Sequence, residues 1–352
     1  MKKNLIALAV AGALAVPAAA MADATIYGKF HVSIDSYDNG GNGAAEASGL
    51  SVSSNSSRLG FKGSEDLGNG LSAIWQTEST IGVDGDGSGL SNRNTYVGFK
   101  GGFGTVMAGK HDSPVKSIGR KVDLFGDQVG DSRSIIRGQI ADGITDDADL
   151  DQRNSNMIMY VTPAMGALQA AFQYVPDEND ADTSVANPDQ TAMNIAAWYN
   201  AGPLYVGLGY GVTQNDDGTA GVEDEKVTRL VASYQMDALK FTGLYQTADG
   251  VSFADNEYDA YGLGVAFNMG GGNTIKAQYY MADADGDEAT MTAIGFDHAM
   301  SKQTSVYAAY AMTSNDTGLT TTPWGGTGHE NLSDGASGED ASALSVGVVH
   351  KF

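Results

Sequence analysis

The chain has 352 residues, 47 glycines, no cysteine and a formal net charge of −23. The absence of cysteine excludes disulfides, iron–sulfur clusters and cysteine-bound zinc. The strong negative charge argues against nucleic acid as a partner, because phosphates would be repelled. The same charge suits a field that attracts cations.

The start of the chain has the pattern of an export signal. Two early lysines, an apolar run from Leu5 to Val16 and the sequence Ala20-Met21-Ala22 are typical of a cleaved signal peptide. We therefore expect residues 1–22 to be a signal peptide and residues 23–352 to be one domain. The mature chain keeps 18 basic and 43 acidic residues, a net charge of −25. No later segment has the roughly 20 consecutive apolar residues that a membrane-spanning helix needs.

Alternating apolar and polar residues begin just after this signal. Ile26, Phe30 and Ile34 fall on one face of the first segment, with polar residues between them. A period of two indicates a strand with one apolar face. The same pattern recurs to the end of the chain, which predicts an all-β protein. The predicted strands are 25–35, 57–62, 71–81, 91–100, 104–110, 153–162, 167–175, 191–200, 204–213, 225–236, 239–247, 257–268, 273–281, 289–299, 303–312 and 341–352.

The connections alternate in length. Short turns such as Ala201-Gly202-Pro203 alternate with long acidic loops such as Thr313–Asp340. Short turns on one side and long loops on the other are typical of outer-membrane barrels. Backbone groups in lipid must pair within the protein, so a chain without spanning helices crosses only as a closed barrel. The pattern therefore predicts a sixteen-stranded antiparallel transmembrane β-barrel.

One long stretch, from Lys110 to Arg153, interrupts this rhythm. Connections of about forty residues are uncommon in a compact domain and are usually functional or disordered. Spacing alone leaves two readings open: a loop that folds back into the barrel lumen, or an acidic surface loop. If it folds inward, we expect Lys116–Gly130 in the lumen; Ile135–Leu150 has no assigned place.

Several short motifs resemble the general diffusion porins of Gram-negative outer membranes. They are Ile26-Tyr27-Gly28-Lys29, Arg58-Leu59-Gly60-Phe61-Lys62-Gly63, Arg93–Lys100, Arg153-Asn154-Ser155-Asn156 and the closing Val346–Phe352. The resemblance covers the mature chain and implies a homotrimer with one water-filled pore per subunit. It also implies that the third extracellular loop folds inward. His350 departs from the family, which usually has an aromatic residue two places before the terminal Phe.

The resemblance implies a constriction with cations on the barrel wall and acids on the loop. The wall candidates are Lys29, Arg58, Arg93 and Arg153, and Arg133 and Arg137 are further candidates for the wall. The loop candidates are Asp123, Asp127, Asp131 and Lys116. Phe352 resembles the signal read by the barrel-assembly machinery. Aromatic residues expected at the lipid interface are Tyr199, Tyr205, Tyr210, Tyr234, Tyr261 and Phe352.

Taken together, these observations predict a passive, non-specific channel for small hydrophilic solutes and ions across the outer membrane. The net acidity predicts a preference for cations. A substrate-specific channel and a plugged surface or adhesin barrel are the alternatives. Phosphate-binding, hydrolase and zinc-protease motifs are missing, so no enzyme, cofactor or metal is predicted. The expected partners are lipid, lipopolysaccharide and the assembly machinery.

Overall fold

The computed structural model describes residues 23–84, 93–138, 149–176, 190–215, 224–250, 257–325, 329 and 332–352. The predicted signal peptide lies outside these residues, as does the middle of the stretch Ile135–Leu150. In the described residues, no helix is long and apolar enough to cross a membrane.

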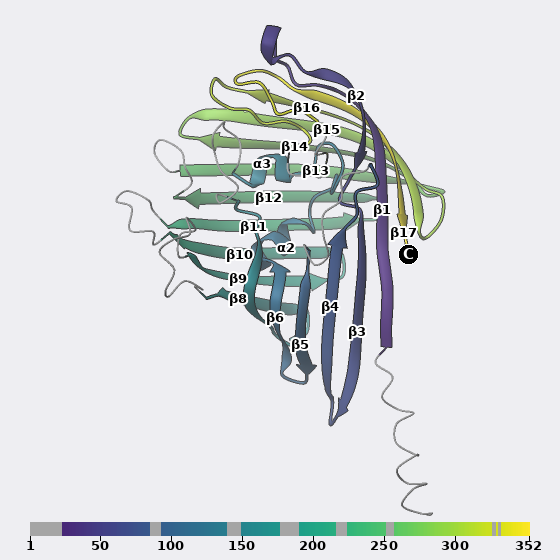
Figure 1. Ribbon diagram of the computed structural model, residues 1–352, viewed down its shortest axis with the longest axis vertical. Helices are drawn as coiled ribbons and strands as arrows, with labels where there is room; N and C mark the ends of the chain where they lie inside the picture. The colour runs from purple at the N-terminus through teal and green to yellow at the C-terminus, as the bar shows by residue number, and fades with distance from the viewer. Residues whose placement is uncertain are drawn as a thin grey trace, which may run out of the picture.

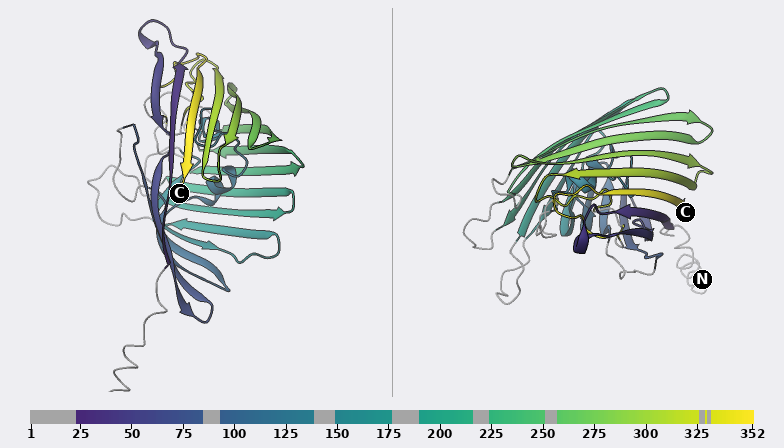
Figure 2. Two further views of the ribbon diagram at one scale, coloured as in Figure 1. Left: turned by 90° about the vertical axis from the view of Figure 1, so that its right-hand side faces the viewer. Right: turned by 90° about the horizontal axis from the view of Figure 1, so that it is seen from above.

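Antiparallel strands form one sheet that closes on itself (Figures 1 and 2). The first strand pairs with the last, from Lys29 opposite Lys351 to Asp38 opposite Ser342. The strands are β1 (Asp23–Asp38), β2 (Ser48–Ser54), β3 (Arg58–Gly68), β4 (Leu71–Thr80), β5 (Thr95–Gly101), β6 (Gly104–Asp112), β7 (Arg153–Val161), β8 (Leu168–Val175), β9 (Gln190–Ala201), β10 (Leu204–Asn215), β11 (Glu225–Met236), β12 (Leu239–Asp249), β13 (Glu257–Gly270), β14 (Asn273–Ala284), β15 (Asp287–Ala299), β16 (Thr304–Asn315) and β17 (Ser342–Lys351).

Two of these strands share one position in the barrel. β2 pairs with the second half of β1, while β3 pairs with its first half. The sixteen predicted strands are all present, and the barrel has sixteen positions. β2 is the one strand that the sequence pattern did not predict, because its alternation is limited to Leu50 and Val52 in a Ser-rich and Gly-rich sequence. A 3-10 helix, η1 (Gly43–Ala45), precedes it.

Alternation along the strands separates an apolar outer face from a polar inner face. Ile26, Leu208 and Leu263 point outward, and more than half of each side chain is exposed. Arg229, on the opposite face of β11, is completely buried. This is the inverse of a soluble core, and it suits a barrel whose outside contacts lipid. Tyr205 is an exception among the predicted interface aromatics, because it packs against the inner apolar cluster.

The barrel seam between β1 and β17 is held beyond the strand ladder. The Gly28 N–H donates to the Phe352 carbonyl at 3.0 Å, and the Phe352 ring stacks on Phe30 at 5.6 Å. A Cβ at position 28 would lie 2.5 Å from the Phe352 ring, so glycine makes room for that ring. At the other end of the seam, the Asn39 side chain donates to the Asp334 carbonyl.

The two rims of the barrel differ, as predicted. Short turns such as Asn69–Gly70 close one rim, and the long connections lie at the other. One connection at the long-loop rim is short: Asp285 and Gly286, both with positive φ, join β14 to β15. Asp283 accepts a hydrogen bond from the Gly286 N–H in this tight turn.

Candidate functional site

The connection between β6 and β7, hereafter the β6–β7 loop, contains α2 (Pro114–Gly119) and α3 (Arg133–Ile136), which lie inside the curved sheet (Figure 1). Ser113 caps α2 by accepting a hydrogen bond from the Lys116 N–H, and Pro114 begins the helix. Pro is favoured at the first position of a helix, where an N–H has no partner. The sequence therefore turns directly from strand into helix.

Glycines on β10 allow α2 to lie close to the barrel wall. A Cβ at Gly209 would lie 2.9 Å from the Ile118 Cδ1 atom, and one at Gly207 would lie 3.1 Å from its Cβ. Val115 and Ile118 are both buried in this contact. The inner face of β10 is thus shaped for the helix, since larger side chains there would displace it.

Arg229 on β11 fastens both ends of the loop to the wall. Its guanidinium donates to Asp151 Oδ1 at 2.7 Å and to the Val115 carbonyl at 3.3 Å. It also donates to Gln246 at 2.7 Å, and Gln246 in turn donates to the Ile136 carbonyl at 2.9 Å. Both Arg229 and Asp151 are shielded from water, so the pair acts in a low-dielectric setting.

The middle of the loop is fastened to β14. Gln278 accepts a hydrogen bond from the Leu124 N–H at 3.1 Å and donates to Asp123 Oδ1 at 3.2 Å. The Lys276 ammonium donates to the Leu124 carbonyl at 3.0 Å and lies over the Phe125 ring. The predicted lumenal segment, Lys116–Gly130, therefore contacts inward-facing side chains on several strands.

Asp127 connects the loop to the first strands. Its Oδ2 atom lies 2.6 Å from the Lys29 ammonium and 3.5 Å from the Arg58 guanidinium. Its Oδ1 atom lies 3.0 Å from Arg120 and 3.2 Å from Arg133. Asp127 has a φ of 62°, a left-handed conformation that Asp tolerates better than most residues. Two predicted wall cations and one predicted loop acid thus meet.

The surrounding cations decide the charge of Asp127. Burial raises the pKa of this carboxyl, but the nearby cations, with Lys29 the strongest, hold it well below its usual range. Asp131 behaves in the same way. Burial is outweighed by Arg133 and Arg120, which keep the Asp131 pKa low. Both loop acids therefore stay ionised across the physiological range.

Asp123 differs from these two acids. Its side chain is 1% exposed, and its one ion-pair contact among the described residues is Arg120 at 3.4 Å. Burial and the neighbouring charge of Asp131 raise the pKa of Asp123 to about 7. Asp123 therefore exchanges its proton near neutral pH.

Water reaches the cations of this cluster more than the acids. Arg58 and Arg120 are 26% and 28% exposed, whereas Asp127 is 10% exposed and Asp131 is fully buried. The acids are buried, and their oxygens are occupied by hydrogen bonds and ion pairs within the loop and with the barrel wall. The charge presented to the lumen at this level is therefore mainly that of arginine.

The other predicted site residues do not contact Asp127. Arg93 pairs with Glu78 at 2.6 Å, and Glu78 lies 3.9 Å from Arg58, so Arg93 joins the cluster through Glu78. Arg153 pairs with Asp112 at 3.0 Å near the base of the loop. Lys116 is buried and donates to the Asp151 carbonyl at 2.7 Å.

Arg133 and Arg137 were considered for the barrel wall, and the structure places both on the loop. Arg133 belongs to α3 and binds Asp127 and Asp131. Arg137 pairs with Asp149 at 3.0 Å. The described parts of Ile135–Leu150 are also placed: Ile135, Ile136 and Leu150 are buried in the main inner apolar cluster.

A second long connection covers the β6–β7 loop. It is the segment between β16 and β17, hereafter the β16–β17 loop. Its Pro323 carbonyl accepts a hydrogen bond from the Gly130 N–H, and its Gly325 carbonyl accepts one from the Ser134 hydroxyl. Trp324 joins a buried cluster with Phe125 and Val129. The position of the β6–β7 loop thus depends both on the barrel wall and on the β16–β17 loop.

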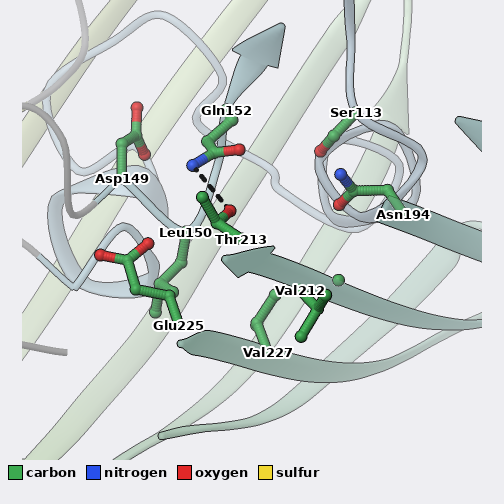
Figure 3. Close-up of a pocket in the computed structure, with 10 residues that line it drawn as sticks. Ser113, Asp149, Leu150, Gln152, Asn194, Val212, Thr213, Glu225 and Val227 are labelled. Atoms are coloured by element: carbon green, nitrogen blue, oxygen red, sulfur yellow. Dashed lines mark hydrogen bonds between the residues drawn. The ribbon is translucent and has the colours of Figure 1, made fainter. Parts of the chain in front are cut away.

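The end of the β6–β7 loop lies against β10 and β11 (Figure 3). Gln152 donates to Thr213 at 3.4 Å beside Leu150 and Val227. The cavity they enclose has a volume of about 10 Å³, enough for one water molecule. The loop is therefore closely packed at this end.

Comparison with known proteins identifies the family. The family described as Gram-negative porin matches residues 7–318. The chain belongs to this family.

Individual relatives agree with the family match. This porin is 30% identical over 371 residues to the major outer membrane protein P.IB of Neisseria lactamica, covering 100% of both chains. It is 32% identical over 370 residues to outer membrane porin protein 32 of Delftia acidovorans, again covering 100% of both. The anion-selective porin from Comamonas acidovorans has a similar structure, with a TM-score of 0.78, 27% identity and coverage of 94% of this chain and 100% of that one.

These comparisons confirm the predicted barrel fold, its outer-membrane location and its channel class, which is not enzymatic. A solved OmpT of Vibrio cholerae, described as a trimer form, shares the fold with a TM-score of 0.68 and 17% identity.

Sequence reasoning missed several residues of the site. Arg120, Arg229, Lys276, Gln278 and Glu78 make its central contacts. Arg229 carried a usable signal, because an arginine between Val227 and Val231, within a membrane strand, indicates a functional position. Arg120 carried none, since it is one of several cations in an irregular loop.

Proposed function

We propose that this porin is a passive diffusion channel whose narrowest section is bounded by the β6–β7 loop, at the level where this loop meets the wall at Lys29 and Arg58. The observation that carries the proposal is Asp127, a loop acid held by wall cations at 2.6 and 3.5 Å. The charges left exposed at this level, mainly those of Arg58 and Arg120, would set the field that a solute meets. Small hydrated solutes would pass, and rings of charge would tune ion preference.

We further propose that the channel prefers anions. The expected cation preference rested on the net charge of the whole chain, to which the acidic loops contribute most. The groups that water reaches at the narrow section are Arg58 and Arg120, while the acids there are 0–10% exposed. The similarity to a porin described as anion-selective supports this sign.

Planar-bilayer recording tests both parts of the proposal. Purified protein should insert in discrete current steps, and a KCl gradient should give a reversal potential of the sign for chloride. The double variant Arg58→Gln with Arg120→Gln should shift the potential toward potassium. The double variant Lys226→Gln with Lys302→Gln removes two charges from exposed residues, one near the start of β11 and one in the turn after β15. It serves as the charge-matched control and should leave the potential unchanged.

Two outcomes would contradict the proposal. Closed molecules without current steps would favour a plugged surface barrel instead of a channel. A wild-type reversal potential with the sign expected for potassium selectivity would overturn the anion preference. It would instead support the cation preference expected from the net charge.

The assembly proposals follow the family. We propose a homotrimer, in line with the related porin described as a trimer form. We also propose that residues 1–22 direct export, that Phe352 is read during barrel assembly, and that the acidic loops contact lipopolysaccharide through divalent cations. The mass of detergent-extracted protein tests the trimer, and a monomeric mass would refute it.

A further inference from the structure

A groove lies in the inner wall on the short-turn side of the cation cluster. It has a volume of about 480 Å³ and is lined by side chains from β3 to β7, including Lys62, Tyr96 and Lys100. These strands lie side by side (Figure 1). Small-molecule sites typically measure roughly 300–1,000 Å³. Lys62 is four residues from Arg58 along β3, so the groove lies about 13 Å from the arginine level.

Two lysines enter this groove from different strands. Lys62 lies opposite Gln76, which lies opposite Tyr96, and Lys100 is four residues beyond Tyr96 on β5. Ideal strand spacing places the two lysine Cα atoms about 17 Å apart. Both lysines are exposed, so their ammonium groups can approach one solute from the two ends of the groove.

Neither lysine forms an ion pair with a described acid, in contrast to Lys29. Lys62 lies 5.0 Å from the centre of the Tyr27 ring, a contact that leaves its charge in place. Asp66, on the same strand, accepts a hydrogen bond from the Gly68 N–H in the turn. The groove therefore offers two positive charges to a ligand.

The surface of the groove is largely apolar. Ile74 lies on β4, between the strands that carry the two lysines, while Met107 and Val161 lie beyond Lys100 on β6 and β7. The Tyr96 ring also lines the groove, and Thr25, Ser64 and Thr105 add hydroxyl groups. Met107 packs against Met157 and Met159, which are also buried and inward-facing. A general porin vestibule would be expected to be polar, so a largely apolar surface favours a solute with a hydrophobic part. The inward methionines of β7 thus take part in the lumen wall.

We propose that this groove binds small organic anions that combine a carboxylate with an apolar body, such as aryl carboxylates. The carboxylate would contact Lys62 or Lys100, and the apolar body would lie on Ile74 and Met107. The inference rests on the proposed channel function and adds a solute class to it. It also gives a physical basis for the substrate-specific alternative, because bound solutes would pass in preference to inorganic ions.

Single-channel chloride current with added benzoate tests the proposal. At neutral pH, benzoate should reduce the wild-type current in a saturable way. Acetate, which has the charge but little apolar surface, should reduce it less at the same concentration. Benzylammonium, which has the ring and the opposite charge, should leave it unchanged.

Variants separate the groove from the general charge of the lumen. The double variant Lys62→Gln with Lys100→Gln should raise the half-blocking benzoate concentration about tenfold, or about 1.4 kcal/mol. Lys240→Gln removes another lysine, which shares the inward parity of Thr242 and Gln246 on β12, and should have no such effect. Ile74→Thr should weaken the effect of benzoate but not that of acetate.

The outcomes distinguish this inference from the channel proposal. Wild-type channels on which benzoate and acetate act alike would overturn the groove and leave the channel proposal standing. Equal shifts in the Lys62/Lys100 and Lys240 variants would also overturn it. Absence of any channel would overturn both proposals. Stepwise chloride current in each variant shows that its barrel has folded.

Discussion

Replacing Arg229 by methionine should loosen the β6–β7 loop while leaving the strands intact. Arg229→Met removes the partner of Asp151 Oδ1, which lies 2.7 Å away in a site with 0–1% side-chain exposure. Leaving one member of a buried ion pair unpaired costs about 3–5 kcal/mol. Lys116 offsets part of this, because its ammonium still forms an ion pair with the other Asp151 oxygen at 3.8 Å. We therefore expect the lower end of the range, and a loss of about 3 kcal/mol lowers the ratio of docked to undocked loop about a hundredfold.

Single-channel recording should therefore show a noisy current in place of a quiet open level, and the thermal midpoint should fall. The double variant Arg229→Met with Asp151→Leu should restore most of the quiet open level and most of the thermal midpoint, because removing the two partners together leaves no unpaired charge. Lys116 keeps Asp112 at 3.5 Å in that double variant. A quiet, wild-type current from Arg229→Met would refute the anchoring role. A double variant as noisy as the single one would refute the unpaired carboxylate as its cause.

Three further changes test other contacts of the loop. Gly209→Ala should overpack against Ile118, which costs about 1–3 kcal/mol of stability and lowers the thermal midpoint. Gly243→Ala is the control and should leave the midpoint unchanged, because a Cβ there would lie 3.8 Å from its nearest neighbours. Equal midpoints for the two variants would contradict the close packing of α2. Trp324→Ala should cost about 3 kcal/mol of stability and add slow fluctuations to the single-channel current, whereas Trp324→Phe should keep the current quiet. A quiet current from both variants would show that the β16–β17 loop does not hold the β6–β7 loop in place. Folding raises the pKa of Asp123 from 3.8 to about 7, so the folded state binds the proton of this carboxyl more tightly than the unfolded state does. The stability that the protonated carboxyl contributes is complete below about pH 4 and is lost as the pH rises through about 7. Thermal midpoints from pH 5 to 8 should therefore fall less steeply in Asp123→Asn than in wild type, and parallel profiles would refute this assignment.

The strands were predictable because each one is encoded locally. Alternation from Ile26 to Ile34 recurs in every strand that faces lipid on one side, and lipid imposes that pattern. β2 has only two alternating apolar residues, Leu50 and Val52. Its position depends on pairing with β1, a contact between segments that local alternation does not encode.

The site was only partly predictable for a related reason. The meeting of Lys29 and Arg58 with Asp127 followed from the family motifs and the interrupted rhythm. The exposure of Arg120 and the burial of Asp123 depend on how an irregular loop folds. Arg153 belongs to a wall motif, yet it pairs with Asp112, because β7 begins at Arg153 directly opposite Asp112, the last residue of β6. The sign of the charge that water meets is thus a property of packing and not of composition.

The seam between β1 and β17 has a consequence for how the barrel forms. The Gly28–Phe352 contacts close a chain of about 320 residues, and the entropy of that closure is about 5 kcal/mol. Hairpins between consecutive strands close much shorter chains, so they form first and the seam closes late. Contacts made late are absent from the rate-limiting transition state, and weakening them mainly accelerates unfolding. The ring stack of Phe30 on Phe352 and the hydrogen bond from Asn39 to Asp334 therefore set the lifetime of the closed barrel more than the speed at which it assembles.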